Sequence, residues 1–382
     1  MIPSQRPPLA PGTSVGKYVV ESHLGEGGNG AVYSALDSVL GRRVALKLLH
    51  PQLVYDAHIA GRFRQEAQAM AQLNHPNVVT VHDLVGEAGT WAIVMELVDG
   101  GETLASLLKR EGRLAPVRAI RLASGVAAGL GHAHARGVVH RDVKPANVMI
   151  VRHQTRPGVV TEIAKISDFG IARLVHGEKR TQGQLTLGTL WYLAPEQAQS
   201  SSVDARADVY ALGATLYEAL TGRVVFPYDN VARVLAAALS EPPTPPSSLA
   251  PGIPPALDEL VLRFISKRPE HRPAHGEEAR TLLDQLEREL EAPRPPTPSL
   301  HTPSALSYTP SVPAPPVAIA HTPSSHAPFA GTPQPLATST PIAGPPKESQ
   351  QLGLLIGVAV VALVSLMCLA SAFMCVMTGI LR

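Results

Sequence analysis

Short apolar stretches, separated by Gly, Asn, His-Pro or charged residues, fill the first hundred residues of the chain. Strands are usually bounded in this way. The pattern predicts strands over residues 17–24, 31–37, 42–49, 77–85 and 91–97. One stretch between them, residues 56–74, has the apolar spacing of a helix.

After residue 100 the periodicity is helical. Residues 115–137 place their apolar side chains on one helix face and stop at a glycine, and residues 203–222 do the same. Two further helices are predicted over residues 254–267 and 275–291. A strand-rich first part followed by a helix-rich second part predicts a two-lobed α+β fold over residues 15–290.

The composition changes on both sides of this region. Residues 1–14 are rich in proline and are predicted to be disordered. Between Arg294 and Lys347 there is no Asp, Glu, Lys or Arg, and Pro, Ala, Ser and Thr dominate. Such a segment buries too little apolar area to fold, so residues 291–350 are predicted to form a disordered, partly polyproline-like linker. Thr-Pro pairs recur in it, which leaves open a passive spacer or a docking and phosphoacceptor tract.

Residues 352–376 carry no charge, and at about 1.5 Å per residue they exceed the ~30 Å hydrocarbon core of a bilayer. They are predicted to form a transmembrane helix, followed by a short tail over residues 377–382. Gly353 and Gly357 form a small-xxx-small pair, which makes a homodimer through this helix one alternative. Cys368 and Cys375 both lie in this run and are interpreted as packing residues.

The net charge of +2 gives no argument for a nucleic-acid partner. No cysteine lies outside the final apolar run, which fits a reducing compartment.

Two stretches of the strand-rich part carry candidate chemistry. "GEGGNGAV" fits G-x-G-x-x-G-x-V through Gly25, Gly27, Gly30 and Val32. Glycines allow backbone N–H groups to approach phosphates, although a simple turn is an equal alternative for this stretch alone. "VALK" then places Lys47 in an apolar strand, where a lysine is costly unless it is paired. Glu66 in the following helix is a candidate partner.

"HRDVKPAN" predicts a loop, because Asp142, Lys144 and Asn147 are too irregularly spaced for one helix face. A carboxylate can accept a proton from a hydroxyl, and an ammonium group can neutralise a phosphoryl group. An amide oxygen can bind Mg²⁺, which prefers oxygen ligands. Asp168 of "KISDFG" is a second candidate ligand for Mg²⁺.

Together these motifs resemble the eukaryote-like Ser/Thr protein kinases of bacteria. The resemblance covers about residues 15–290 and rests on six motifs in order, which are "GEGGNGAV", "VALK", Glu66, "HRDVKPAN", "DFG" and "APE". It implies the bilobal protein-kinase fold and transfer of the γ-phosphoryl group of ATP to Ser/Thr hydroxyls of proteins in bacterial signalling.

The resemblance also implies a role for each motif residue. Asp142 would orient the acceptor hydroxyl, Lys144 would contact the γ-phosphate, and Lys47 would grip the other phosphates while pairing with Glu66. Asn147 and Asp168 would bind Mg²⁺, for which Mn²⁺ can substitute. The implied ATP site consists of Gly25, Glu26, Gly27, Gly28, Asn29, Gly30, Val32, Ala45, Lys47, Met95, Glu96, Val98 and Met149.

The segment after "DFG" resembles an activation segment. Thr181 and Thr186 are the candidate phosphorylation sites, with Thr181 preferred and ordinary surface threonines as the alternative. Arg141 and Arg173 would receive the phosphate.

Other residues are implied to support this segment and the catalytic loop. Thr189 would contact Asp142 and Lys144. Glu196 would form a buried ion pair with Arg272, and Asp208 would tie the catalytic loop to the long central helix.

We therefore expect an autophosphorylating kinase in the inner membrane, with one span, a cytoplasmic kinase domain and no extracellular sensor domain. A pseudokinase scaffold is the alternative from another class, and the intact Lys47, Asp142, Asn147 and Asp168 argue against it. A small-molecule kinase is disfavoured because "GTLWYLAPE" serves peptide substrates.

Overall fold

A computed structural model describes most of the first 292 residues. The described ranges are 8–27, 30–49, 64, 67–87, 90–98, 100–156, 158–169, 187–199 and 203–292. The predicted linker beyond residue 292 and the predicted transmembrane helix lie outside these ranges. Within them, no helix has both the length and the apolar character needed to cross a bilayer.

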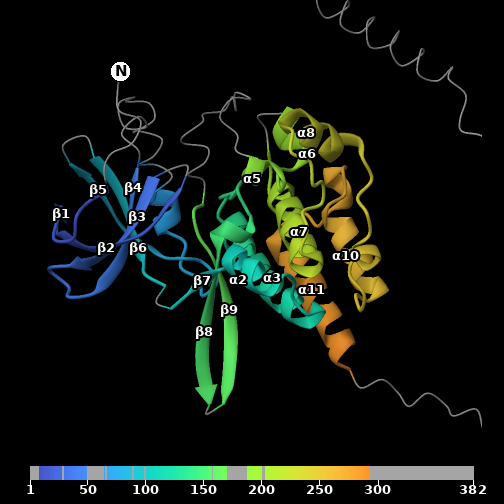
Figure 1. Cartoon of the computed structure of the whole chain (residues 1–382), viewed down its shortest axis with the longest axis horizontal. Helices are drawn as coiled ribbons and strands as arrows, with labels where there is room; N and C mark the ends of the chain where they lie inside the picture. Colours follow the sequence, from blue (N-terminus) through green and yellow to red (C-terminus); the bar gives the residue numbers. More distant parts are fainter. Residues whose placement is uncertain are drawn as a thin grey trace, which may run out of the picture. The chain divides into compact units, whose positions relative to one another are not determined.

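The N-terminal part is an antiparallel sheet of six strands in the order β1-β2-β3-β4-β6-β5 (Figure 1). Its strands are β1 (Ser14–Val15), β2 (Tyr18–Gly27), β3 (Gly30–Asp37), β4 (Arg43–Leu49), β5 (Val81–Glu87) and β6 (Thr90–Glu96). The strands predicted over residues 17–24, 31–37, 42–49 and 91–97 are confirmed, with shifted ends. Residues 67–71, within the predicted helix over residues 56–74, are helical.

The central strand β4 is buried on both faces, and its two faces belong to different apolar cores. Val44, Leu46 and Leu48 contribute to one small apolar core of the sheet. Side chains alternate between the faces of a strand, so Ala45 and Lys47 lie on the opposite face. Ala45 there belongs to the larger core shared with the helical part.

The strand predicted over residues 77–85 begins later than expected. Val78 and Val79 are apolar, but they do not extend the sheet. Instead Val78 forms an isolated bridge to Ile166, and Val79 N–H donates to the Ile166 carbonyl at 2.9 Å. These contacts connect the strand-rich part to β9 (Val159–Ile166) of the helical part.

The second part is mainly helical, and one helix lies at its centre. α7 (Arg206–Thr221) has 14 buried residues of 16, so it is surrounded by protein on all sides. The other elements are β7 (Glu102–Thr103), α2 (Leu104–Glu111), α3 (Pro116–His134), η2 (Pro145–Asn147), β8 (Val148–Arg156), α5 (Leu187–Leu190), α6 (Pro195–Gln199), α8 (Val231–Ser240), α9 (Pro246–Leu249), α10 (Pro255–Phe264), η3 (Pro269–His271) and α11 (Gly276–Glu291). The four helices predicted from periodicity correspond to α3, α7, α10 and α11.

Helix α11 begins in close contact with α3, because both helices have a glycine where they meet. A Cβ atom on Gly276 would lie 2.4 Å from Gly131 N and 2.6 Å from the Ala127 carbonyl oxygen. A larger residue at this position would therefore force the two helices apart.

The stretch before "SDFG" forms a long two-stranded hairpin of β8 and β9 (Figure 1). A closed network of ion pairs joins this hairpin to β7, α2 and α3. Arg152 and Arg110 both bind Glu102 at 2.6 Å. The network consists of Glu102, Arg110, Glu111, Arg118, Arg152 and Glu162.

Glu162 is the best-connected carboxylate of this network. It accepts two hydrogen bonds from Arg118, at 2.6 and 2.8 Å, and a third from Arg152 at 3.2 Å. These bonds, with that from Arg118 the strongest, lower the pKa of Glu162 below its usual range.

We expect Glu162→Gln to lower the free energy of unfolding by about 1–2 kcal/mol in low salt, since networks and bidentate pairs contribute more than isolated surface pairs. The difference from the parent protein should shrink in 1 M salt. Denaturant melts at both salt concentrations would measure it. Glu259→Gln is the control, because Glu259 is exposed and forms no ion pair with the described residues. Equal stability of the two variants would contradict the role of the network.

Candidate active site

The glycine-rich turn connects β2 and β3, and Gly30 is the glycine whose role is clearest. Its φ is +147°, and a Cβ atom there would lie only 1.9 Å from the Leu48 carbonyl oxygen. Gly30 thus lies close beside β4, where it pairs with Leu49 and approaches Leu48, the residue after Lys47. Across the hairpin Gly25 pairs with Val32 and Gly27 with Gly30. Gly28 and Asn29 lie outside the described residues.

Lys47 is a buried lysine, at 5% exposure, and it is paired as expected for such a residue. Its Nζ lies 2.8 Å from Asp168 Oδ1. The predicted partner Glu66 lies outside the described residues. Its pairing with Lys47 therefore stays a prediction, and the ion pair to Asp168 was not predicted.

Asp168 has an unusual backbone, with φ at +65°, which is costly for a residue that is not glycine. Burial would raise the pKa of its carboxyl, but the charge and the hydrogen bond of Lys47 outweigh burial and lower it. Asp168 is therefore ionised at neutral pH. The next residue, Phe169, is buried against the His140 ring, with 4.4 Å between ring centroids.

The loop after α3 brings the three polar residues of "HRDVKPAN" together. Lys144 Nζ donates to Asp142 Oδ2 at 2.8 Å and to Thr189 Oγ1 at 3.0 Å. Asn147 Nδ2 donates to the Asp142 carbonyl oxygen at 2.8 Å and to Oδ2 at 3.1 Å. The Oδ1 atom of Asn147 therefore points away from Asp142. Ser167 N–H donates to the Asn147 carbonyl at 2.9 Å, which places the residue before Asp168 beside this loop.

Asp208 of the central helix α7 anchors the same loop through hydrogen bonds to its backbone. Its carboxylate accepts hydrogen bonds from the backbone N–H groups of His140 and Arg141, both at 2.7 Å. It also accepts one from His134 Nε2 at 2.9 Å, because the other ring nitrogen of His134 accepts from Gly276 N–H. Arg141 needs this support, since its φ is +66°. Although burial opposes ionisation, these bonds, led by that from His134, lower the pKa of Asp208.

Glu196 and Arg272 form a two-pronged ion pair, with N–O distances of 2.7 and 3.0 Å. Arg272 is 4% exposed, and its remaining donors bind backbone carbonyls of Ser266, Lys267 and Arg206. This pair holds α6 against the start of α7. Arg173, Thr181 and Thr186 lie outside the described residues.

The residues implied to surround adenine lie on the edge where the two parts meet. Ala45 is paired with Met95 across β4 and β6, and both side chains are buried. Met149 on β8 approaches Gly101, whose Cβ would lie 3.4 Å from the methionine methyl group and 2.5 Å from Val98 Cγ1. A small residue at position 101 therefore keeps the chain close to Val98 and Met149.

Glu96 carries an ion pair that sequence reasoning missed. Its Oε1 lies 2.8 Å from Lys165 Nζ on β9, and its N–H donates to the Thr80 carbonyl at 2.8 Å. Because that N–H already donates to Thr80, the adenine of ATP could form a backbone hydrogen bond at this residue only with the Glu96 carbonyl oxygen. The sequence carries no signal for this pair, because its two members lie 69 residues apart.

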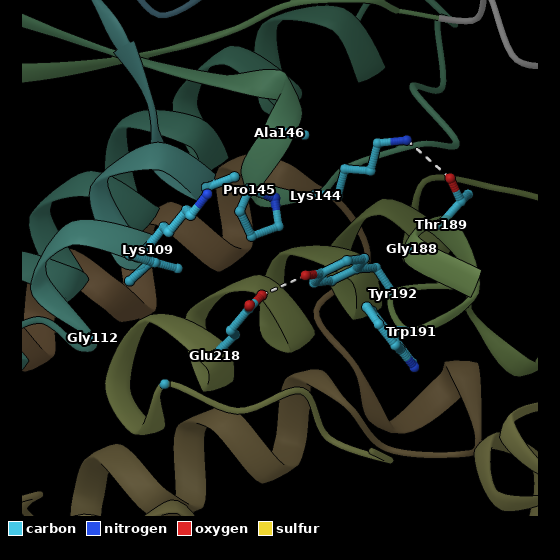
Figure 2. A pocket seen from close by; sticks show the side chains of 13 residues that line it. Lys109, Gly112, Lys144, Pro145, Ala146, Gly188, Thr189, Trp191, Tyr192 and Glu218 are labelled. Carbon is cyan, nitrogen blue, oxygen red and sulfur yellow. Dashed lines mark hydrogen bonds between the residues drawn. The ribbon is translucent and has the colours of Figure 1, made fainter. Parts of the chain in front are cut away.

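A cavity of about 450 Å³ opens beside Lys144 and Thr189 (Figure 2). Its walls come from α2, the loop of Lys144, the segment of Thr189 and α7. The Tyr192 hydroxyl donates a hydrogen bond to the Glu218 carboxylate, and both side chains line the cavity. Sequence reasoning singled out neither residue of this pair.

The model of the protein kinase domain family matches residues 18–285. The serine/threonine-protein kinase PknB of Mycobacterium tuberculosis is 44% identical over 263 residues, which are 67% of this chain and 40% of that protein. Serine/threonine-protein kinase pkn3 of Myxococcus xanthus is 39% identical over 72% of this chain and 50% of its own length. The chain thus spans two-fifths to one-half of these relatives.

A solved structure gives the same result for the fold. The kinase domain of Mycobacterium tuberculosis PknI matches with a TM-score of 0.59 and 28% identity, covering 73% of this chain and 99% of that one. The family match covers more than two-thirds of the chain, and it includes every motif from the glycine-rich turn to Arg272. The chain therefore belongs to the protein kinase family.

Proposed function

We propose that the chain is a Ser/Thr protein kinase, which transfers the γ-phosphoryl group of ATP to Ser/Thr hydroxyls of proteins in bacterial signalling. The observation that carries this proposal is a set of two ion pairs, one between Lys47 and Asp168 and one between Lys144 and Asp142. Two lysines and two carboxylates at these places fit a reaction that depends on positioning and on stabilising charge.

Asp142 and Lys144 have different roles in this reaction. The Asp142 carboxylate orients the acceptor hydroxyl and takes its proton as the oxygen–phosphorus bond forms and the bond to ADP breaks. Lys144, held 2.8 Å from Asp142, stabilises the negative charge on the transferring group. Lys144 also bonds Thr189 at 3.0 Å, which ties the loop to the segment expected to receive a Ser/Thr peptide.

The oxygens present fit Mg²⁺. Asn147 Oδ1 and the Asp168 carboxylate are hard donors, and both are oriented by bonds on their other side. In the described ranges no group of three or more His, Cys, Asp or Glu side chains could hold a metal. Mg²⁺ needs only one or two protein ligands, because water molecules and substrate phosphates supply its other ligands. When bound, it neutralises the phosphates.

Lys47→Met is expected to lower phosphoryl transfer by about 100-fold or more, because the charge beside Asp168 disappears from a site that works through charge stabilisation. Transfer of label from γ-labelled ATP to a mixed Ser/Thr peptide set would measure this. Lys17→Met, which removes an exposed cation from the turn between β1 and β2, is the control. Full activity of Lys47→Met with unchanged folding would contradict the site.

We further propose autophosphorylation of Thr181 or Thr186, recognised by Arg141 and Arg173, and anchoring of the kinase to the inner membrane through residues 352–376. The charge-free run and the Gly353/Gly357 pair support the anchor and a homodimer. Phosphopeptide mapping and membrane fractionation test them separately. Label at neither threonine, or a protein that stays out of the membrane fraction, would refute the corresponding proposal.

A further inference from the structure

The cavity beside Lys144 is the place where side chains flanking an acceptor residue would lie. Lys144 and Thr189 line its rim, so a hydroxyl held at Asp142 would place the neighbouring substrate residues at its mouth. α2 forms one wall, with Lys109 and Leu108 among its lining residues. Figure 2 shows Lys109 on the same side of the cavity as Pro145.

Most charges around this cavity are already balanced. Lys144 is paired with Asp142. Glu218 is half-buried and accepts a hydrogen bond from the Tyr192 hydroxyl, and burial raises the pKa of its carboxyl. Glu218 is therefore a weak attractant for a substrate cation.

Lys109 is different from these groups. Its side chain is exposed, and no carboxylate of the described residues pairs with it. The neighbouring Arg110, by contrast, is bound to Glu102 at 2.6 Å and to Glu111 at 3.2 Å. Arg110 therefore helps to fix α2 in the ion-pair network, while Lys109 is the unbalanced charge on the cavity wall.

Resting on the proposed function, we propose that Lys109 is a specificity-determining residue, which favours protein substrates with Asp or Glu within a few residues of the acceptor. The attraction acts at the edge of the site, so it changes which substrate binds and leaves the chemistry to Asp142 and Lys144. It weakens as salt increases.

The test uses the full chain and peptides with one Thr acceptor, in which Glu, Gln or Lys is placed in turn at each of the three positions on either side. For the parent protein, we expect kcat/KM to be about 5- to 10-fold higher with Glu than with Gln at one or more positions, which is the size of one favourable charge contact. Lys109→Glu should reverse the order, so that the Lys peptide becomes the better substrate. That gain cannot come from misfolding.

Arg113→Glu is the matched control, because it makes the same change of net charge at an exposed residue that does not line the cavity. It should keep the preference of the parent protein. Equal rates for Glu and Gln peptides, or an unchanged preference in Lys109→Glu, would overturn the inference. Label on the protein itself but on none of the peptides would also overturn it. Absence of all label from the parent protein would instead refute the proposed kinase function.

Discussion

Asp142→Asn is expected to lower the rate of phosphoryl transfer by about 10³-fold, within the range for loss of a positioned proton acceptor. Asparagine has nearly the same shape, so the loop can keep its bond from Lys144. It cannot take a proton from the acceptor hydroxyl, however, and it removes a negative charge that lies 2.8 Å from Lys144 and 3.1 Å from Asn147 Nδ2. Single-turnover transfer from γ-labelled ATP would measure the loss, and nucleotide binding should persist.

Asp229→Asn provides the control for this experiment, since Asp229 is exposed in the connection between α7 and α8. A rate within about threefold of the parent protein for Asp142→Asn would show that no proton passes to this carboxylate. The role assigned to the loop would then be wrong.

Asp208→Ala should have the largest effect on stability, about 3–5 kcal/mol of the free energy of unfolding. The substitution removes a fully buried carboxylate that accepts hydrogen bonds from two backbone N–H groups and from His134. Those donors would remain buried without their partner. Arg141 would also lose the bond that holds its left-handed backbone, so transfer should fall together with stability.

The pH dependence follows from the lowered pKa of Asp208. Since the folded protein holds this carboxyl ionised more strongly than the unfolded chain does, the stabilisation is complete above the ordinary pKa of 3.8. It is lost as the pH falls through the lower folded pKa. Urea melts at pH 7 and near pH 3 should therefore show a larger difference between the parent protein and Asp208→Ala at pH 7. A difference below about 1 kcal/mol at pH 7 would contradict this account.

The sequence predicted the elements whose apolar pattern is unambiguous. Helix α7 is an example, because its predicted span over residues 203–222 contains the observed Arg206–Thr221. The start of β5 was predicted wrongly, because Val78 and Val79 are as apolar as a strand requires. Their backbone groups pair with Ile166 instead, and only tertiary structure decides between these partners.

The candidate site likewise contains features that the sequence predicted and features that it could not predict. Spacing and residue type placed Asp142, Lys144 and Asn147 in one loop, and the structure brings them within hydrogen-bond distance. The ion-pair network around Glu162 had no signal in the sequence, because its members come from five elements that meet only after folding. The roles of Glu66, Thr181 and Thr186 stay predictions.

The most direct test of the central claim is phosphoamino-acid analysis of protein labelled by the full chain with γ-labelled ATP and Mg²⁺. We expect label on serine and threonine, and we expect it to be lost in both Asp142→Asn and Lys47→Met. Nucleotide binding by the parent protein without label on any hydroxyl amino acid would contradict it, and would identify the fold as a nucleotide-binding scaffold.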